Sequence, residues 1–248
     1  MQFTEKEILL MRKAGEMTGR ALKYAQTLIV PGISTMYLDK KIKKYIIDMG
    51  GEPNFLDYEG YPGSICASVN DVIVHGIPSE EVILKEGDII SIDLGVSYKG
   101  FNGDAARTFP VGNISPEKQK LIDVTKQCFY EGLAQVKAGA HIGDIGEAIQ
   151  TYAENHGYSV VRELVGHGIG RKLHMDPQIP NYGTRGTLEV IESNTALAIE
   201  PMINMGKKNI YVKRDGWTVC TKDGLPSAHY ENTVLVTESG VEILTNEP

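Results

Sequence analysis

The sequence has few cysteines and no apolar segment long enough to cross a membrane. Its three cysteines, Cys66, Cys128 and Cys220, are widely spaced and form no C-x-x-C pair. This spacing excludes a disulfide framework and a zinc knuckle, and it favours reduced thiols. No apolar run approaches the roughly 18 residues that span a bilayer. The N-terminal stretch carries acidic residues and no uninterrupted apolar segment, so we expect no secretory signal and a cytoplasmic location.

Basic residues are not in excess either. The chain has 25 lysines and arginines against 32 acidic residues, which gives a formal net charge of -7. A nucleic-acid-binding protein gathers basic side chains on one face, so we expect no direct nucleic-acid partner. Because 42% of the 248 residues are hydrophobic, the chain can bury a core without disulfides, and an intrinsically disordered class is excluded.

Helix signals divide the chain into two similar halves. Thr4 and Glu7 form a capping box, Ser34 is a second helix start, and Pro116 occupies the first position of a third helix. The predicted helices cover about residues 5–30, 35–49, 116–137 and 140–156. Strand-like runs lie between and after them, at residues 64–70, 89–96, 105–111, 195–200 and 232–236. We therefore predict an α+β protein.

The two halves also match residue by residue. When the first half is shifted by 107 residues, five of its residues fall on identical or similar residues of the second half. The pairs are Gly32 and Gly139, Leu38 and Ile145, Ile42 and Ile149, Tyr45 and Tyr152, Gly50 and Gly157. Five matches in one frame indicate an internal duplication, although helix–glycine–helix punctuation also arises by chance. No linker separates the halves, so we expect one domain built from two related lobes.

Acidic residues interrupt sequence that is otherwise typical of buried strands. Asp93 lies within the apolar run 89–96, and Asp104 follows the turn-like residues 100–103. A hairpin that reverses near residues 98–100 would place Asp93 directly opposite Asp104, with Cβ atoms about 5 Å apart. Two carboxylates about 4 Å apart repel by roughly 4 kcal/mol at an effective dielectric near 20. Such a pair needs a positive partner, either a metal ion or a side chain such as Arg107.

Three further residues extend this acidic pattern. Glu200 closes an apolar run, Glu231 precedes another, and His167 stands between Gly166 and Gly168. Buried carboxylates are costly unless they are paired or bind metal. Taken singly, these residues also fit a strand end or a turn. Taken together, four carboxylates and one imidazole favour a site for two divalent cations bridged by the acids.

The sequence resembles the type I methionine aminopeptidases over essentially its whole length. The stretches that carry the resemblance are GSICASVN (63–70), VHGIP (74–78), DIISID (88–93), GHGIG (166–170), LHMDP (173–177) and AIEPM (198–202). The resemblance implies a pita-bread (creatinase/aminopeptidase-like) fold, with two pseudo-symmetric halves around a curved antiparallel sheet and a single catalytic domain over residues 1–248. It also implies the metal ligands Asp93, Asp104, His167, Glu200 and Glu231.

The same resemblance assigns catalytic roles outside the ligand set. His75 and His174 correspond to histidines that contact the scissile amide and the tetrahedral intermediate. Glu200 combines the roles of ligand and general base. His229 lies two residues before Glu231 and therefore on the same strand face, which makes it a candidate to contact the ligands rather than to bind metal.

An apolar pocket for the methionine side chain is also implied. Its residues correspond to Tyr58, Tyr61, Cys66 and Trp217, and His75 and His174 contact the substrate beside them. Two positions depart from several relatives: Leu173 replaces an aromatic residue, and Phe55 stands where some carry cysteine. These departures affect the expected shape of the pocket.

The resemblance further implies removal of the initiator methionine from new polypeptides, with preference for a small second residue. Two ions drawn from cobalt, manganese, iron, zinc or nickel fit the ligand set. Only 25 residues separate His174 from Glu200, too few for the helical insertion of type II enzymes, and the chain begins close to its first helix, so we expect the bacterial form. Expected partners are nascent polypeptides near the ribosome, without a membrane, and the expected state is a monomer.

Three alternatives remain at this point. A proline-specific aminopeptidase of the same fold normally carries a separate N-terminal domain. A non-catalytic peptide-binding homologue typically loses metal ligands, and all five are present here. A mononuclear hydrolase would use only part of the set, and metal stoichiometry distinguishes it from a dinuclear enzyme.

Overall fold

The computed structural model describes residues 2–246. Its first half contains, in chain order, α1 (Glu5–Leu28), α2 (Thr35–Asp48), β1 (Glu52–Pro53), the 3-10 turn η1 (Tyr58–Gly60), β2 (Cys66–Val69), β3 (Val72–Val74), β4 (Ile89–Tyr98) and β5 (Phe101–Pro110). Its second half contains α3 (Pro116–Leu133), α4 (Ile142–Asn155), β6 (Ser159–Val160), β7 (Gly166–Gly168), β8 (Met175–Ile179), β9 (Thr195–Ile199), β10 (Met202–Asn204), β11 (Ile210–Val212), β12 (Val219–Thr221), β13 (Ser227–His229), β14 (Asn232–Thr237) and β15 (Gly240–Ile243). The predicted α+β class is confirmed.

The helix ends follow the signals in the sequence, with one exception. The capping box is present at α1, because the Thr4 hydroxyl accepts from the Glu7 amide and the Glu7 carboxylate accepts from the Thr4 amide. Helix α3 ends at Leu133 rather than near Lys137. The chain leaves the helix there in tight turns that bury Val136 in the core. None of the helices within residues 2–246 is both long and apolar enough to cross a membrane.

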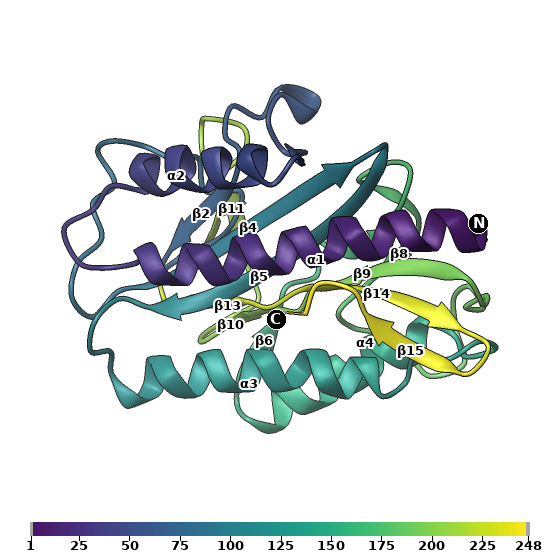
Figure 1. The fold of residues 1–248 in the computed structure, drawn as a ribbon. Coiled ribbons are helices and arrows are strands. Elements are labelled where there is room, and N and C mark those ends of the chain that lie inside the picture. The colour runs from purple at the N-terminus through teal and green to yellow at the C-terminus, as the bar shows by residue number, and fades with distance from the viewer. Residues whose placement is uncertain (1, 247–248) are drawn as a thin grey trace.

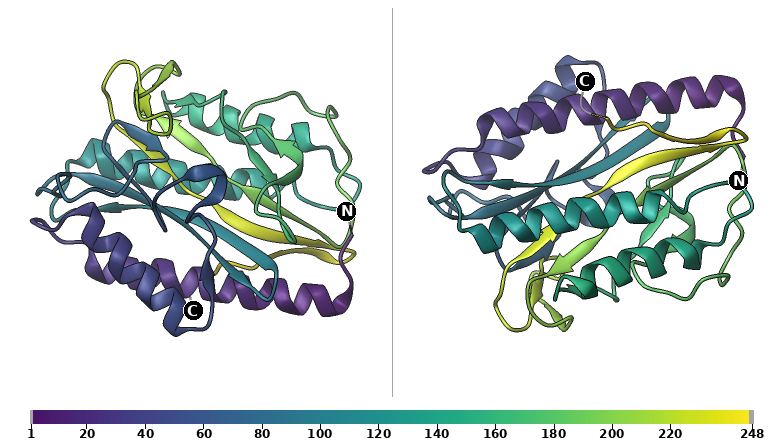
Figure 2. Two further views of the ribbon diagram at one scale, coloured as in Figure 1. Left: turned by 90° about the horizontal axis from the view of Figure 1, so that it is seen from above. Right: turned by 90° about the horizontal axis from the view of Figure 1, so that it is seen from below.

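The strands form a central layer between two pairs of helices (Figures 1 and 2). Helices α1 and α2 cover one side, where α1 packs on β4 and β5. Helices α3 and α4 pack on each other and cover the other side, against β13, β6 and β8. Each pair of helices buries an apolar core of its own against its strands. A third apolar cluster lies beside the acidic residues and includes Phe55, Tyr61, Cys66 and Leu173.

Hydrogen bonds divide the strands into four sheets in which every strand pair is antiparallel. The sheet β15-β14-β9-β7-β8 carries the second half, and β4 is the centre of the first. The halves meet between β5 and the segment before β14, where Ala106 and Glu231 exchange main-chain hydrogen bonds. Beside them, the Thr233 hydroxyl accepts from the Asp104 amide and donates to its carbonyl. These bonds fix Asp104 and Glu231 relative to each other.

The register predicted for the β4–β5 hairpin is wrong by two residues. Asp104 pairs with Gly95 and Asp93 pairs with Ala106, so the two acids are diagonal neighbours on one face, about 7 Å apart, rather than direct partners. The cause is the turn: it occupies Lys99 and Gly100, whose φ angles of 49° and 82° suit a two-residue hairpin loop. Residues 101–103, expected in the turn, are therefore in strand β5.

The structural halves repeat in the frame found in the sequence. A shift of 107 residues carries α2 onto the limits of α4. The glycines that flank the two helices also correspond in conformation, with φ of 93° at Gly32 and 88° at Gly139, and 81° at Gly50 and 82° at Gly157. This correspondence supports the proposal of an internal duplication within one domain.

Candidate metal centre

Five residues with metal-binding side chains converge from both halves of the molecule. Asp93 and Asp104 come from β4 and β5, and His167 is the central residue of β7. Glu200 follows β9 directly, and Glu231 lies between β13 and β14. Because each side chain is set by a strand or by the first residue beyond one, the main chain itself determines the spacing of the cluster.

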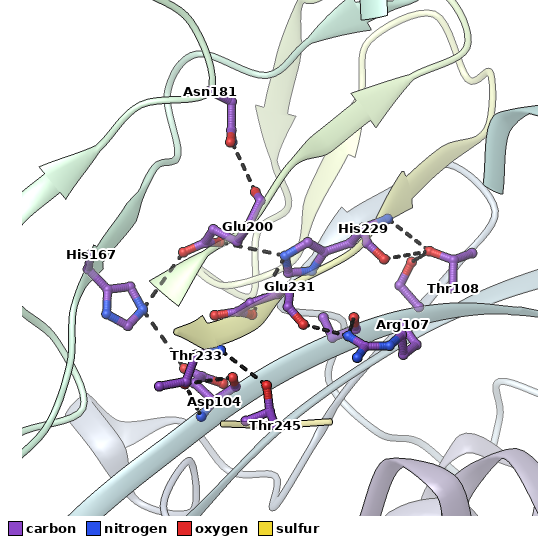
Figure 3. A network of polar contacts seen from close by, with 12 residues as sticks. Asp104, Arg107, Thr108, His167, Asn181, Glu200, His229, Glu231, Thr233 and Thr245 are labelled. Atoms are coloured by element: carbon purple, nitrogen blue, oxygen red, sulfur yellow. Dashed lines mark hydrogen bonds and ion pairs between the residues drawn. The ribbon is translucent and has the colours of Figure 1, made fainter. Parts of the chain in front are cut away.

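Glu200 lies at the centre of the cluster, between two imidazoles (Figure 3). Its Oε1 atom is 3.7 Å from His167 Nε2, and that nitrogen is 3.8 Å from Asp104 Oδ2. The donor atoms of His167, Glu200 and Glu231 all lie within 4.8 Å of one another, as do those of Asp93, His229 and Glu231. Side chains at such separations can share cations placed between them.

His167 is oriented by its own strand. Its Nδ1 atom lies 2.9 Å from the Gly168 carbonyl, which places the proton on Nδ1 and leaves the Nε2 lone pair facing Asp104 and Glu200. The flanking glycines let neighbouring strands approach: a Cβ at Gly166 would be 2.3 Å from the Ala198 carbonyl oxygen, and one at Gly168 would be 2.2 Å from that of Asp176. Burial lowers the pKa of His167 to about 3, so the imidazole is neutral near pH 7 and able to bind a cation.

The carboxylates are buried without enough partners. Within the described residues, one oxygen each of Asp93, Asp104 and Glu231 is buried and has no hydrogen-bond partner. Burial raises the pKa of Asp93 to about 7. The pKa values of Asp104, Glu200 and Glu231 are raised well above their usual range by burial first and by the neighbouring carboxylates second. Cations among these oxygens would supply the missing partners, so the residues fit a metal centre.

These raised pKa values predict that metal affinity depends on pH. Below about pH 7, Asp93 holds a proton that a cation must displace, so affinity rises as the pH increases from about 6 to about 8. The raised pKa values of Asp104, Glu200 and Glu231 act in the same direction. Each proton displaced adds about a tenfold gain per pH unit. Calorimetric titration of the metal-free protein with Mn²⁺, in two buffers of different ionisation enthalpy, counts the protons released. An affinity independent of pH, without proton release, would contradict the prediction.

Two further histidines approach the cluster from loops. His75 has a φ of 57°, a left-handed conformation that is uncommon for a residue with a side chain. The His174 ring lies 4.3 Å from that of His167, edge to face, and its Nδ1 is 2.9 Å from the Tyr58 hydroxyl. Burial and the neighbouring His174 lower the pKa of His75 to about 4, and burial lowers that of His174. Both rings are therefore neutral near pH 7.

A cavity of about 850 Å³ opens beside these groups. One wall is apolar: Tyr61 and Trp217 pack edge to face at 5.2 Å, with Cys66 and Leu173 also on the wall. The Tyr61 hydroxyl donates toward the carbonyls of Ile65 and Gly76, which fixes the ring. The carboxylates line the same cavity, and Asp93 is the direct cross-strand neighbour of Cys66. The arrangement suits a ligand with an apolar side chain next to a group that binds metal.

The structure brings all eleven residues expected to bind metal, act on the peptide bond or hold the substrate to this one cavity: Tyr58, Tyr61, Cys66, His75, Asp93, Asp104, His167, His174, Glu200, Trp217 and Glu231. Phe55 and Leu173, the two departures, also line it. The contact between Tyr58 and His174 was not anticipated, since 116 positions separate them in sequence. Arg107, the alternative partner for Asp93, lies on the other face of the hairpin, because it pairs with Ile92.

Comparisons with known proteins agree with this geometry. Residues 9–238 match metallopeptidase family M24. The chain is 48% identical to methionine aminopeptidase 1 of Bacillus subtilis over 242 residues, which cover 98% of this chain and 97% of that protein.

Solved structures are similar as well. The crystal structure of a methionine aminopeptidase from Thermotoga maritima matches with a TM-score of 0.98 and 43% identity, covering 100% of this chain and 99% of that one. The Xaa-Pro dipeptidase from Bacillus anthracis matches with a TM-score of 0.81 but only 23% identity, and this chain covers 62% of it. The second likeness shows the shared pita-bread fold alone.

Proposed function

The chain belongs to metallopeptidase family M24 and to its methionine aminopeptidase group, and we propose that it removes the initiator methionine from new polypeptides using two divalent metal ions. The observation that carries this proposal is that apolar side chains and five potential ligands line the same cavity. An aminopeptidase needs these two features together, because the side chain must be bound while the first peptide bond is held at the reacting centre.

The chain's own residues would hold the cations at two adjoining positions. His167, Glu200 and Asp104 form one side, and Asp93 and Glu231 approach from the other. When bound, the divalent ions lower the pKa of water toward neutrality and polarise the scissile carbonyl. The Oε1 atom of Glu200 faces His167, and its Oε2 atom faces His229. This carboxylate is placed to take the proton of the attacking water and pass it on.

The two loop histidines act on the peptide bond itself. We assign the proton of neutral His174 to Nε2, because the Tyr58 hydroxyl can donate to Nδ1. Nε2–H is then a donor for the oxygen on which negative charge develops. His75 lies on the same cavity, next to Trp217, and is placed to contact the amide nitrogen that leaves. The substrate's free amino group would bind beside the carboxylates, which restricts cleavage to the first bond.

The experiment that tests the function uses metal-free protein and the tripeptide Met-Ala-Ser. Each of cobalt, manganese, iron, zinc and nickel is added back in turn, and the amount bound is measured alongside the release of methionine. We expect no release without metal and release with at least one of the five at two equivalents bound. Full activity at one equivalent would favour the mononuclear alternative.

The shape of the pocket predicts the specificity for the second residue. The apolar residues around Tyr61 and Trp217 suit the flexible thioether of methionine, and we propose that the adjoining space admits small side chains. We expect Met-Gly and Met-Ala peptides to exceed Met-Leu and Met-Arg by about 10–200-fold in kcat/KM. Leu173 provides a smaller wall than an aromatic residue and would lower this ratio.

A Met-X-Ser series measures the ratio, with Leu-Ala and X-Pro peptides as controls. Equal kcat/KM for Met-Ala and Met-Arg would contradict the preference. Preferential cleavage before proline would assign the chain to the proline-specific branch. The 23% identity to the Xaa-Pro dipeptidase, against 48% to the Bacillus subtilis methionine aminopeptidase, disfavours that branch.

The cellular setting follows from the same proposal. Cys66, Cys128 and Cys220 are free and buried, which supports a reducing compartment such as the cytoplasm. We propose that the protein acts there as a monomer on nascent chains close to the ribosome, without membrane or direct nucleic-acid contact.

A further inference from the structure

His229 is a buried histidine directly behind the proposed metal ligands. It ends strand β13, its exposed fraction is 1%, and it is not among the described residues that line the cavity. Its Nε2 atom is 3.6 Å from Glu200 Oε2 and 3.8 Å from Glu231 Oε2 (Figure 3). The ring therefore faces one oxygen of each of two carboxylates that line the cavity.

The main chain fixes the position of this ring. The His229 amide donates to the Thr108 hydroxyl, and that hydroxyl donates to the His229 carbonyl. Alternation along the segment puts His229 and Glu231 on one face, while Tyr230 points the other way and packs on Phe129 and Arg107. In the described part of the chain, neither ring nitrogen of His229 has a hydrogen-bond partner. A buried imidazole held this firmly with no partner needs one.

Glu200 is the residue that can supply it. Its Oε1 atom faces His167 Nε2 at 3.7 Å, and its Oε2 atom faces His229 Nε2 at 3.6 Å. We propose that His229 is a positioning residue, whose Nε2–H donates to Glu200 Oε2 and so keeps Oε1 directed at the metal side. This inference rests on the proposed function. The present separation is longer than a hydrogen bond, and rotation about the soft terminal torsion of Glu200 shortens it.

The proposed bond has two consequences. It removes one of the two ways in which the carboxylate could bind a cation, because an oxygen that accepts from His229 is less available as a ligand. It also keeps the other oxygen, Oε1, at a fixed place for proton transfer. Groups that orient a metal ligand in this way typically contribute 10–100-fold to metal affinity or activity.

Three substitutions at one position separate this role from others. The side-chain amide of His229→Gln reaches the place of Nε2, that of His229→Asn reaches only the place of Nδ1, and His229→Leu has no donor. The full-length, metal-free proteins are titrated with Co²⁺ alone, and both calorimetry and the visible absorption of bound cobalt are recorded. His156→Leu is the control, since that ring bonds the Tyr152 carbonyl on the outer helix α4.

We expect His229→Gln to bind Co²⁺ within about threefold of the parent, with the same spectrum. His229→Leu and His229→Asn should bind about 10–100-fold more weakly, with a shifted spectrum and unchanged stoichiometry. Parent-like binding by His229→Leu would overturn the proposal. Loss of one whole cobalt equivalent in both His229→Gln and His229→Leu would also overturn it, because His229 would then be a ligand.

The test requires neither that His229→Leu folds nor that the protein cleaves peptides. If His229→Leu fails to fold, judged by circular dichroism, the Gln and Asn variants still decide, and equal binding by these two would contradict the proposal. No peptide is used, so inactivity of the parent on Met-Ala-Ser would overturn the proposed function while the cobalt measurements still decide the role of His229.

Discussion

Asp104→Asn and Glu231→Gln are expected to lose metal and activity together. Both carboxylates are buried at the junction between the two halves, and each has an oxygen without a hydrogen-bond partner among the described residues. An amide of the same size keeps the packing but removes the negative charge that would hold the two proposed cations close together. Because metal ions contribute several kcal/mol to transition-state stabilisation, their loss lowers kcat/KM by about 10³-fold or more.

Elemental analysis after dialysis, together with hydrolysis of Met-Ala-Ser, measures both effects on the same samples. Asp48→Asn is the matched control, because this exposed carboxylate on α2 forms an ion pair with Lys44 and lies outside the cavity. It should keep metal and activity at the parent level. Equal metal content in the parent and in Asp104→Asn or Glu231→Gln would contradict the ligand assignment, whatever happens to the rate.

The hairpin shows where sequence reasoning about the site stops. The apolar run around Asp93 was sufficient to predict a buried strand, and alternation was sufficient to place Asp93 and Asp104 on one face. The register required the location of the turn, and several positions near residue 99 are compatible with a reversal. Lys99 adopts a positive φ although only Gly100 signals one in the sequence. A register shift of two residues leaves Asp93 and Asp104 on the same face of the hairpin, so the expectation that the two carboxylates lie close together holds despite the error.

Contacts between distant loops were beyond prediction for a different reason. Tyr58 belongs to a turn in which Asp57 and Glu59 both have positive φ, although only Gly60 beside them indicates such a conformation in the sequence. The turn carries the Tyr58 hydroxyl to His174, and nothing local to either residue predicts that meeting. By contrast, the expected position of His229 next to Glu231 is confirmed, because a separation of two residues puts both side chains on one face. Local periodicity predicts faces, and only tertiary packing determines which faces meet.

His174→Ala is expected to lower kcat by about 10²-fold or more while the metal content stays at the parent level. Removing a single preorganised donor to a developing oxyanion typically costs 10²–10³-fold. His75→Ala should behave in the same way through its contact with the leaving amide nitrogen. KM should change little for both, because these contacts strengthen in the transition state rather than in the bound substrate. Steady-state kinetics on Met-Ala-Ser and elemental analysis of each variant provide the two readouts.

A graded series isolates the role of the His174 proton. Tyr58→Phe removes only the hydroxyl that faces Nδ1, so it should cost less than His174→Ala, about tenfold in kcat, by releasing the ring to the other tautomer. His156→Leu, on the outer helix, should leave kcat unchanged. The donor atoms of Asp104, His167 and His174 also lie within 4.8 Å of one another, so a role of His174 as a ligand has to be tested. If His174→Ala lost metal as readily as His167→Ala, His174 would be a ligand and the oxyanion contact would have to come from another residue.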